Sequence, residues 1–173
     1  MQLNTSRLLL RQPLPSDFHD IIVMRNSEFI LRYNPLSIIT EERMQKELEQ
    51  EFDSQDVFYL ELKGLGKVVG KVSLEEDTLR YGVNALSISY HLNETYTSNG
   101  YMTEALNEVI KYAFTIRNVD VLSARIFAKN RASQNLIERV GFTKEGKIRY
   151  CVKGYKGEVF DDYIYSLLKS EYK

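Results

Sequence analysis

The sequence has few of the residues that build disulfide frameworks and metal centres. It contains one cysteine, Cys151, and two histidines, His19 and His91, among 173 residues. A single cysteine excludes an internal disulfide and fits a reducing compartment such as the cytoplasm. Without cysteines or histidines at metal-binding spacings, the sequence gives no basis for a metal site, and we expect none.

Strong net charge and long apolar runs are also missing. The formal net charge is −1, which gives no electrostatic footprint for non-specific binding to nucleic acid or to an anionic membrane. No apolar run is long enough to span a bilayer, and the N-terminus does not look like a signal peptide. We therefore expect a cytoplasmic protein with no nucleic-acid or membrane partner.

Repeats, low-complexity segments and linkers are absent as well. The length of 173 residues is enough for a real core, so one domain over residues 1–173 is the natural expectation. The sequence leaves open whether the chain is a monomer or a homodimer.

The most informative stretch runs from residue 85 to residue 114. Residues 86–92 alternate apolar and polar side chains, which predicts a strand. After a polar loop, apolar residues recur at helical spacing, which predicts a helix with one buried face. The residues of that face are Met102, Ala105, Leu106, Val109, Ile110 and Ala113.

The loop at residues 97–103 lies at the N-terminus of the predicted helix. Unpaired backbone N–H groups and the positive end of the helix dipole favour a phosphate there. Gly100 would let the backbone approach such a ligand closely. The alternative is that Gly100 is an ordinary turn glycine. The loop has neither the Gly-Lys-Ser/Thr of a Walker loop nor the several glycines of a dinucleotide fingerprint.

The rest of the chain alternates strand and helix patterns. Helices are expected after Ser16 or Asp17, after Thr40 and after Asn130, because these residues are good N-caps. The strand at 119–127 should lie parallel to the strand at 86–92, because a helix crosses over between them. The expected strands are 7–11, 57–62, 68–74, 86–92, 119–127, 147–153 and 161–168.

Two segments together carry a family resemblance. Residues 128–142 predict a short helix that begins after Asn130 and ends at Gly141. Its pattern Asn-x-x-Ser followed by Gly-Phe, and the loop at 97–103 before it, resemble the two cofactor motifs of the GCN5-related N-acetyltransferases (GNAT). The segment Gly-Tyr-Met-Thr-Glu-Ala-Leu at 100–106 is similar to the corresponding segment in the branch of ribosomal-protein N-terminal acetyltransferases.

This resemblance covers residue 7 to about residue 168 and implies both a fold and an activity. The implied fold is α+β: a single mixed, mostly antiparallel sheet of about seven strands, splayed at a central parallel pair, with helices on both faces. The implied activity is direct acetyl transfer from acetyl-CoA to a primary amine. The acceptor amine would belong to a protein N-terminus or to a small molecule such as a polyamine, an amino sugar or an aminoglycoside.

The resemblance also implies how acetyl-CoA would be held. Backbone amides of the loop would bind its pyrophosphate, and the end of the central strand would pair with its pantetheine arm. Thr97 and Met102 depart from the family pattern, which has Gln or Arg and a small residue there, and this lowers the expected affinity. The implied cofactor-binding residues are Tyr90, His91, Leu92, Thr97, Ser98, Asn99, Gly100, Tyr101, Met102, Thr103, Asn130 and Ser133.

Acetyl transfer requires an oxyanion donor, an acid and a base. The resemblance places the oxyanion donor at the backbone N–H of Leu92. It makes Ser133 the candidate general acid, because Ile137 stands where many family members have a tyrosine. The alternative is that Ser133 only bonds backbone in the first helical turn.

The sequence leaves the base open. Members of the branch often have a glutamate on the central strand, where this chain has Ser87. The remaining candidates are Glu75, His91, Asp161 and a water relay. His91 has a suitable intrinsic pKa, but the alternative is a structural histidine on a buried strand.

The acceptor site would lie beside residues 29–39, which form one of its walls in the resembling family. Tyr33, Asn34 and Asp161 are the predicted acceptor contacts. The alternatives are that residues 29–39 serve only as lid and core residues, and that Asp161 closes the C-terminal hairpin. A non-catalytic CoA- or partner-binding module on the same fold is the alternative function.

Overall fold

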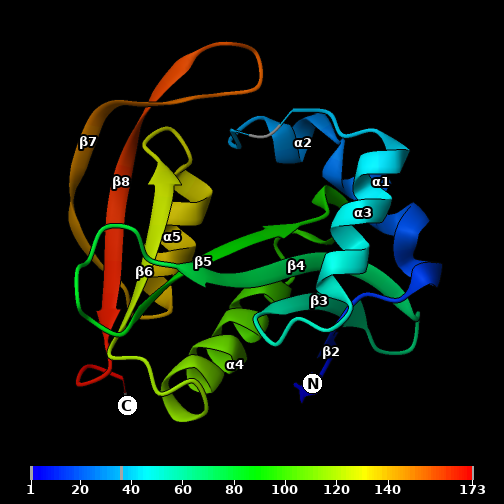
Figure 1. The fold of residues 1–173 in the computed structure, drawn as a ribbon, viewed down its shortest axis with the longest axis horizontal. Helices are drawn as coiled ribbons and strands as arrows, with labels where there is room; N and C mark the ends of the chain where they lie inside the picture. Colours follow the sequence, from blue (N-terminus) through cyan, green and yellow to red (C-terminus); the bar gives the residue numbers. More distant parts are fainter. Residues whose placement is uncertain (1, 36, 173) are drawn as a thin grey trace.

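The computed structural model describes residues 2–35 and 37–172. One sheet of eight strands runs in the order β1-β2-β3-β4-β5-β6-β8-β7 (Figure 1). The strands are β1 (Gln2–Asn4), β2 (Leu8–Arg11), β3 (Val57–Leu62), β4 (Lys67–Glu76), β5 (Ala85–Leu92), β6 (Val121–Phe127), β7 (Thr143–Lys153) and β8 (Val159–Leu168). The helices are α1 (Phe18–Arg25), α2 (Glu28–Leu31), α3 (Glu41–Glu51), α4 (Tyr101–Thr115) and α5 (Arg131–Arg139), with 3-10 turns η1 (Pro15–Asp17) and η2 (Glu94–Tyr96).

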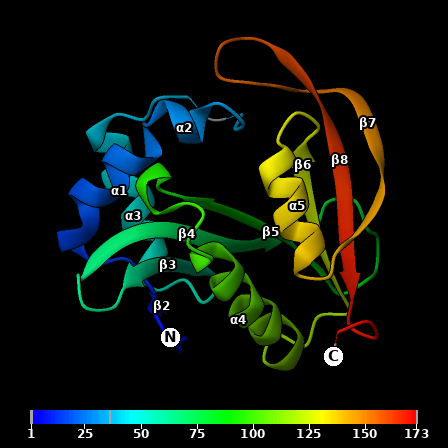
Figure 2. The same ribbon diagram turned by 180° about the vertical axis from the view of Figure 1, so that it is seen from behind.

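Helices cover both faces of the sheet. Figure 1 shows α1 and α3 in front of β3 and β4, and Figure 2, from behind, shows α4 and α5 on the other face. The larger apolar core lies under α4, and a smaller one lies between the sheet and α1 and α3. The predicted mixed sheet with helices on both faces is therefore confirmed.

Helices α3 and α5 begin at the predicted caps. Helix α1 also begins after Asp17, but the Asp17 side chain does not cap it, because its carboxylate accepts from Arg11 and from the backbone N–H of Leu14. The Thr40 hydroxyl accepts a hydrogen bond from the backbone N–H of Arg43 and caps α3. The Asn130 side chain accepts one from the backbone N–H of Ser133 and caps α5. All six residues of the predicted apolar face of α4 are buried. Within the described part of the chain, no helix combines the length and apolar character needed to cross a membrane.

The parallel pair β5 and β6 is joined only at its beginning. The two strands pair over three positions, Ala85 with Val121, Leu86 with Leu122 and Ser87 with Ser123. Beyond them β5 stays paired with β4 as far as Leu92, while β6 stays paired with β8 as far as Phe127. The sheet therefore opens between the ends of β5 and β6, as the predicted splay requires.

Three features differ from the sequence-based expectation. The sheet has eight strands rather than about seven, because the short strand β1 pairs with β2 at the edge. Strand β7 begins at Thr143 rather than at residue 147, and it is mostly exposed, so no apolar alternation marks its start. The short helix α2 lies in the segment expected as a connection.

Gly70 permits the close approach of β4 to the end of β5. A Cβ at Gly70 would stand 2.8 Å from the carbonyl oxygen of His91 and 2.9 Å from Leu60 Cδ1 and Leu92 Cδ1. We expect Gly70→Ala to lower the free energy of unfolding by about 1–3 kcal/mol in chemical denaturation, because it overpacks the strand pair. Gly146→Ala is the matched control, since its Cβ would meet nothing within 4 Å. Equal losses in the two variants would contradict this account.

Candidate active site

Two cavities meet where β5 and β6 diverge. The strand-side cavity, of about 470 Å³, lies between the polar face of β4 and β5 and helices α1 and α3. The loop-side cavity, of about 640 Å³, lies beside the loop at 97–103 and helix α5. Both volumes are in the range of small-molecule sites. Among the described residues, six line both cavities and define the junction between them: Tyr33, Asn34, Tyr90, His91, Asn130 and Ser133.

The loop-side cavity gathers the predicted cofactor residues. All of them except Asn99 line it. Gly100 has a φ of 79°, in the left-handed region that glycine adopts easily, and α4 begins at the next residue. The Asn99 side chain instead donates to the backbone oxygens of Tyr96 and Thr97, and so shapes the loop from within. The geometry suits a phosphate at the N-terminus of α4.

Arg7 anchors the loop from a distant part of the chain. Its Nε donates to the Glu104 carboxylate at 2.7 Å, and its Nη1 donates to the Asn99 backbone oxygen at 2.9 Å. Its guanidinium also lies over the Tyr101 ring, 4.5 Å from the centroid. Burial alone would raise the pKa of Glu104, but hydrogen bonds from Thr5, Arg7 and Ser6 outweigh it and lower the pKa to about 2.

Sequence reasoning missed two cations of the loop-side cavity. Arg32 and Arg139 line it, and both are exposed. They come from the end of α2 and the end of α5, which the fold brings to one cavity. Arginine is well suited to phosphate oxygens, but no local sequence pattern relates these two positions.

Ser133 lies at the junction beside Tyr90. Its backbone N–H donates to Asn130 Oδ1 at 3.2 Å, and its backbone oxygen accepts from the Tyr90 hydroxyl at 3.2 Å. The Ser133 side chain also lies within hydrogen-bonding reach of the Tyr90 hydroxyl. Burial raises the pKa of Tyr90, which stays a hydrogen-bond donor.

The backbone N–H of Leu92 faces the opening of the sheet. The next residue, Asn93, donates its N–H to Val69 of β4 at 2.8 Å. Backbone N–H groups alternate in direction along an antiparallel strand. The N–H of Leu92 therefore points away from β4, toward the side where β6 has diverged.

The three side-chain candidates for the base lie in different surroundings. Burial, and then the charges of Lys71 and Arg25, lower the pKa of His91 to about 3, so it is neutral at neutral pH and a weak proton acceptor. Glu75 is exposed, lines the strand-side cavity and accepts from Ser89 Oγ at 3.2 Å.

Asp161 lies apart from both cavities in the β7–β8 hairpin. Its carboxylate accepts from Lys147 Nζ and from the backbone N–H of Tyr150, both at 2.7 Å. These bonds lower the pKa of Asp161, with the Lys147 hydrogen bond as the largest cause. The adjacent Asp162 lines the strand-side cavity instead. The geometry therefore favours the alternative in which Asp161 closes the hairpin.

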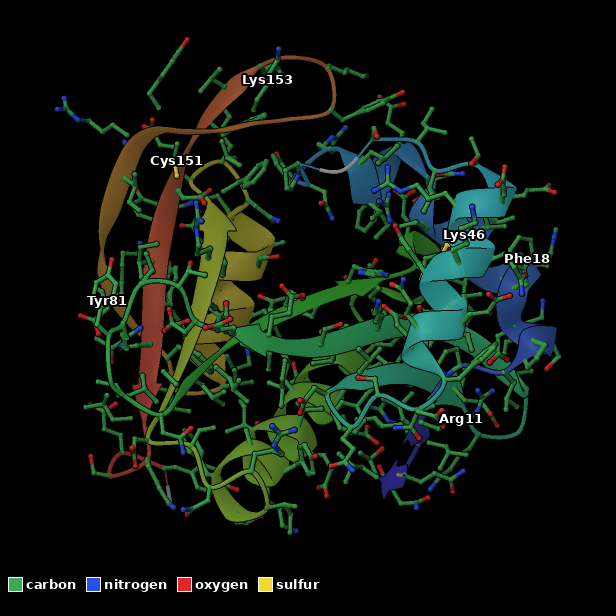
Figure 3. The ribbon with its side chains drawn as sticks, in the orientation of Figure 1. Arg11, Phe18, Lys46, Tyr81, Cys151 and Lys153 are labelled. Atoms are coloured by element: carbon green, nitrogen blue, oxygen red, sulfur yellow. The ribbon has the colours of Figure 1, made fainter. Side chains whose placement is uncertain are left out.

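Aromatic and charged side chains complete the strand-side cavity. The Tyr33 ring packs edge-on against Phe127 and Phe160, each with centroids 6.4 Å apart. Arg125 Nη2 donates to Asp162 at 2.9 Å and also contacts Cys151 Sγ at 2.9 Å. Figure 3 labels Cys151, which lies on β7. No group of three or more His, Cys, Asp or Glu side chains among the described residues is arranged to hold a metal ion.

Comparisons with known proteins identify relatives. A family model described as "Acetyltransferase (GNAT) domain" matches residues 7–143. The uncharacterized N-acetyltransferase YoaA of Bacillus subtilis (strain 168) is 28% identical over 177 residues, 96% of each chain. An acetyltransferase (GNAT family) structure from Bacillus anthracis has a TM-score of 0.88 at 24% identity, covering 99% of this chain and 100% of that one. The ribosomal-protein-S5-alanine acetyltransferase from Vibrio fischeri has a TM-score of 0.84 at 24% identity, covering 100% of this chain and 99% of that one.

His91, which is partly buried and lines both cavities, predicts a pH-dependent stability. Its folded pKa of about 3 lies below the ordinary value of about 6.5, so the unfolded chain binds more protons between these limits. The free energy of unfolding should therefore fall as the pH drops below about 6.5. Its slope against pH should approach the value for one proton taken up on unfolding. Denaturation midpoints measured from pH 7 to pH 5 would show this slope.

His91→Gln should flatten this slope, whereas His19→Gln, at an exposed position, should leave it unchanged. Glu104 does not interfere, because its contribution is lost only below its unfolded pKa of about 4.5, toward pH 2. An unchanged slope in His91→Gln would show that His91 is not the group responsible.

Proposed function

This chain belongs to the acetyltransferase (GNAT) family and is an N-acetyltransferase, and we propose that it transfers the acetyl group directly from acetyl-CoA to a primary amine. The observation that supports this is the junction, where six residues line both cavities at the opening between β5 and β6. Acetyl-CoA would occupy the loop-side cavity and the amine would enter from the strand-side cavity, so the two reactants would meet there.

The loop-side cavity fits the chemistry of acetyl-CoA. The loop at 97–103 and the N-terminus of α4 offer backbone N–H groups to a pyrophosphate, and Arg32 and Arg139 add positive charge. The end of β5, which has no strand partner on the side of β6, offers backbone groups to the amides of the pantetheine arm. Acetyl-CoA supplies an acetyl group activated as a thioester.

Residues at the junction and in the two cavities that meet there match the steps of acyl transfer. The N–H of Leu92 would stabilise the negative charge that develops on the carbonyl oxygen. The hydroxyl of Ser133, which lies beside the Tyr90 hydroxyl, would donate a proton to the leaving thiolate. Glu75 would take the proton of the amine through water, because it is the predicted base that lines the cavity as a solvated carboxylate.

The acceptor would be a protein N-terminal amine or a small-molecule amine. The Vibrio fischeri enzyme is 24% identical to this chain, so the similarity shows a shared fold and supports a protein N-terminal amine only in that way. The alternative of a non-catalytic CoA-binding module is disfavoured by the relatives, which are described as N-acetyltransferases.

Acetyl-CoA binding should depend on the loop. We expect calorimetry to detect saturable binding of acetyl-CoA to the wild type and at least about a tenfold weaker affinity in Gly100→Glu, because bulk and negative charge would oppose the pyrophosphate. Gly82→Glu is the matched control: both glycines have positive φ, of 79° and 67°, but Gly82 lies outside both cavities. Equal binding by Gly100→Glu and wild type would refute this placement of the cofactor.

The proposed acid gives a separate prediction. We expect Ser133→Ala to lower kcat by at least about tenfold at saturating amine, because the leaving thiolate would lose its proton donor. The KM for acetyl-CoA should change much less, and Ser170→Ala, at an exposed position, should retain full turnover. Unchanged kcat in Ser133→Ala would remove this residue from the mechanism.

A further inference from the structure

Some of the charged side chains that line the strand-side cavity form ion pairs with other side chains, and some do not. Six charged side chains line it: Arg25, Glu47, Lys71, Glu75, Arg125 and Asp162. Lys71 Nζ lies 2.6 Å from Glu51, and Arg125 Nη2 lies 2.9 Å from Asp162. On the rim, Glu47 lies 3.3 Å from Arg43.

The remaining two charges are Glu75 and Arg25. Glu75 is exposed, so water solvates its carboxylate. Arg25 is only 9% exposed, and within the described ranges no carboxylate oxygen lies within 4.0 Å of its guanidinium. Its single protein hydrogen bond there runs from Nη1 to the Ser37 backbone oxygen, at 3.2 Å. A guanidinium has five N–H donors, so most of this group's capacity is unused.

An arginine buried in this way is costly unless a partner offsets its lost hydration. Burial lowers the pKa of Arg25, and the attraction of Glu47 only partly opposes this effect. Arginine nevertheless stays protonated in proteins. The wall of the cavity therefore keeps a positive charge near the junction, where it acts on the neighbouring His91.

We propose that Arg25 binds a carboxylate carried by the acceptor, so that the acceptor is a molecule with both a primary amine and a carboxylate. This inference rests on the proposed function, because it assumes that the amine reaches the junction through the strand-side cavity. The planar guanidinium can grip a carboxylate with two parallel hydrogen bonds. A dianionic phosphate suits the site less well, because Glu47, Glu75 and Asp162 line the same cavity.

The position of Arg25 makes it a residue that selects the acceptor rather than one that reacts. It lies in the last turn of α1, whereas the predicted catalytic groups come from β4, β5 and α5. It would hold the carboxylate in the strand-side cavity while the amine points to the junction. Polyamines, which carry only positive charges, would be repelled at this wall.

The first test measures carboxylate binding directly. In the protein saturated with CoA, the Arg25 Nε–H resonance, assigned by its absence in Arg25→Lys, is followed during titration with γ-aminobutyrate and, separately, with 4-aminobutanamide. We expect a saturable shift with the carboxylate and none with the amide. No shift of the Arg25 resonance with γ-aminobutyrate, β-alanine or the dipeptide Ala-Glu would overturn the proposal.

The second test measures acetylation with matched acceptors. Release of the CoA thiol is followed with Ala-Glu-amide and Ala-Gln-amide, and with spermidine as a cationic acceptor. We expect kcat/KM to favour the glutamate peptide by at least about tenfold, and Arg25→Gln to abolish this preference. Arg149→Gln, which removes an exposed arginine outside both cavities, should retain it.

The outcomes separate this inference from the proposed function. Transfer to spermidine or Ala-Gln-amide as fast as to Ala-Glu-amide would support the transferase and overturn the role of Arg25. Absence of acetyl-CoA binding would instead contradict the proposed function. Circular dichroism spectra and melting temperatures close to wild type establish that Arg25→Gln is folded, and Arg25→Lys, which keeps the charge, should retain part of the preference.

Discussion

Strands β5 and β6 pair over only a short distance, and this short pairing places the two cavities and the groups that line them. Three paired positions hold the strands together, and then each strand follows its antiparallel neighbour, β4 or β8. Backbone groups at the end of β5 are left without a strand partner on one side. Such groups are strong donors and acceptors, so the opening is suited to a ligand with amide groups. The same opening joins the two cavities at the junction.

The two sides of this opening are built differently, and each suits a different reactant. The loop side is made of backbone N–H groups, an α-helix N-terminus and exposed arginines, with the loop fixed by Arg7 and Glu104. The strand side is made of β-sheet side chains whose charges are mostly paired. Anionic phosphates match the loop side. A smaller acceptor that carries both an amine and a carboxylate matches the strand side.

The sequence predicts the fold and the loop side well because these depend on local patterns. The alternation at 86–92, the apolar face of α4 and the cap at Asn130 each act within a few residues. They also lie in the order of the family motifs. The start of β7 was missed because an exposed edge strand has no apolar alternation to mark it.

The strand side was harder to predict because its residues meet only through the fold. Arg25, Lys71, Arg125 and Asp162 come from four elements, and nothing in their spacing relates them. Arg7 likewise reaches Glu104 across 97 positions. The roles predicted for Tyr33, Asn34 and Ser133 remain predictions, although the structure brings all three to the junction.

The most direct test of this account is a crystal structure of the protein with CoA bound. We expect the pyrophosphate to lie against the loop at 97–103 and the pantetheine arm to lie along the end of β5. The sulfur should lie at the junction, near Ser133 and the adjacent Leu92. A CoA sulfur outside the junction, or a pyrophosphate bound away from the loop, would contradict the account.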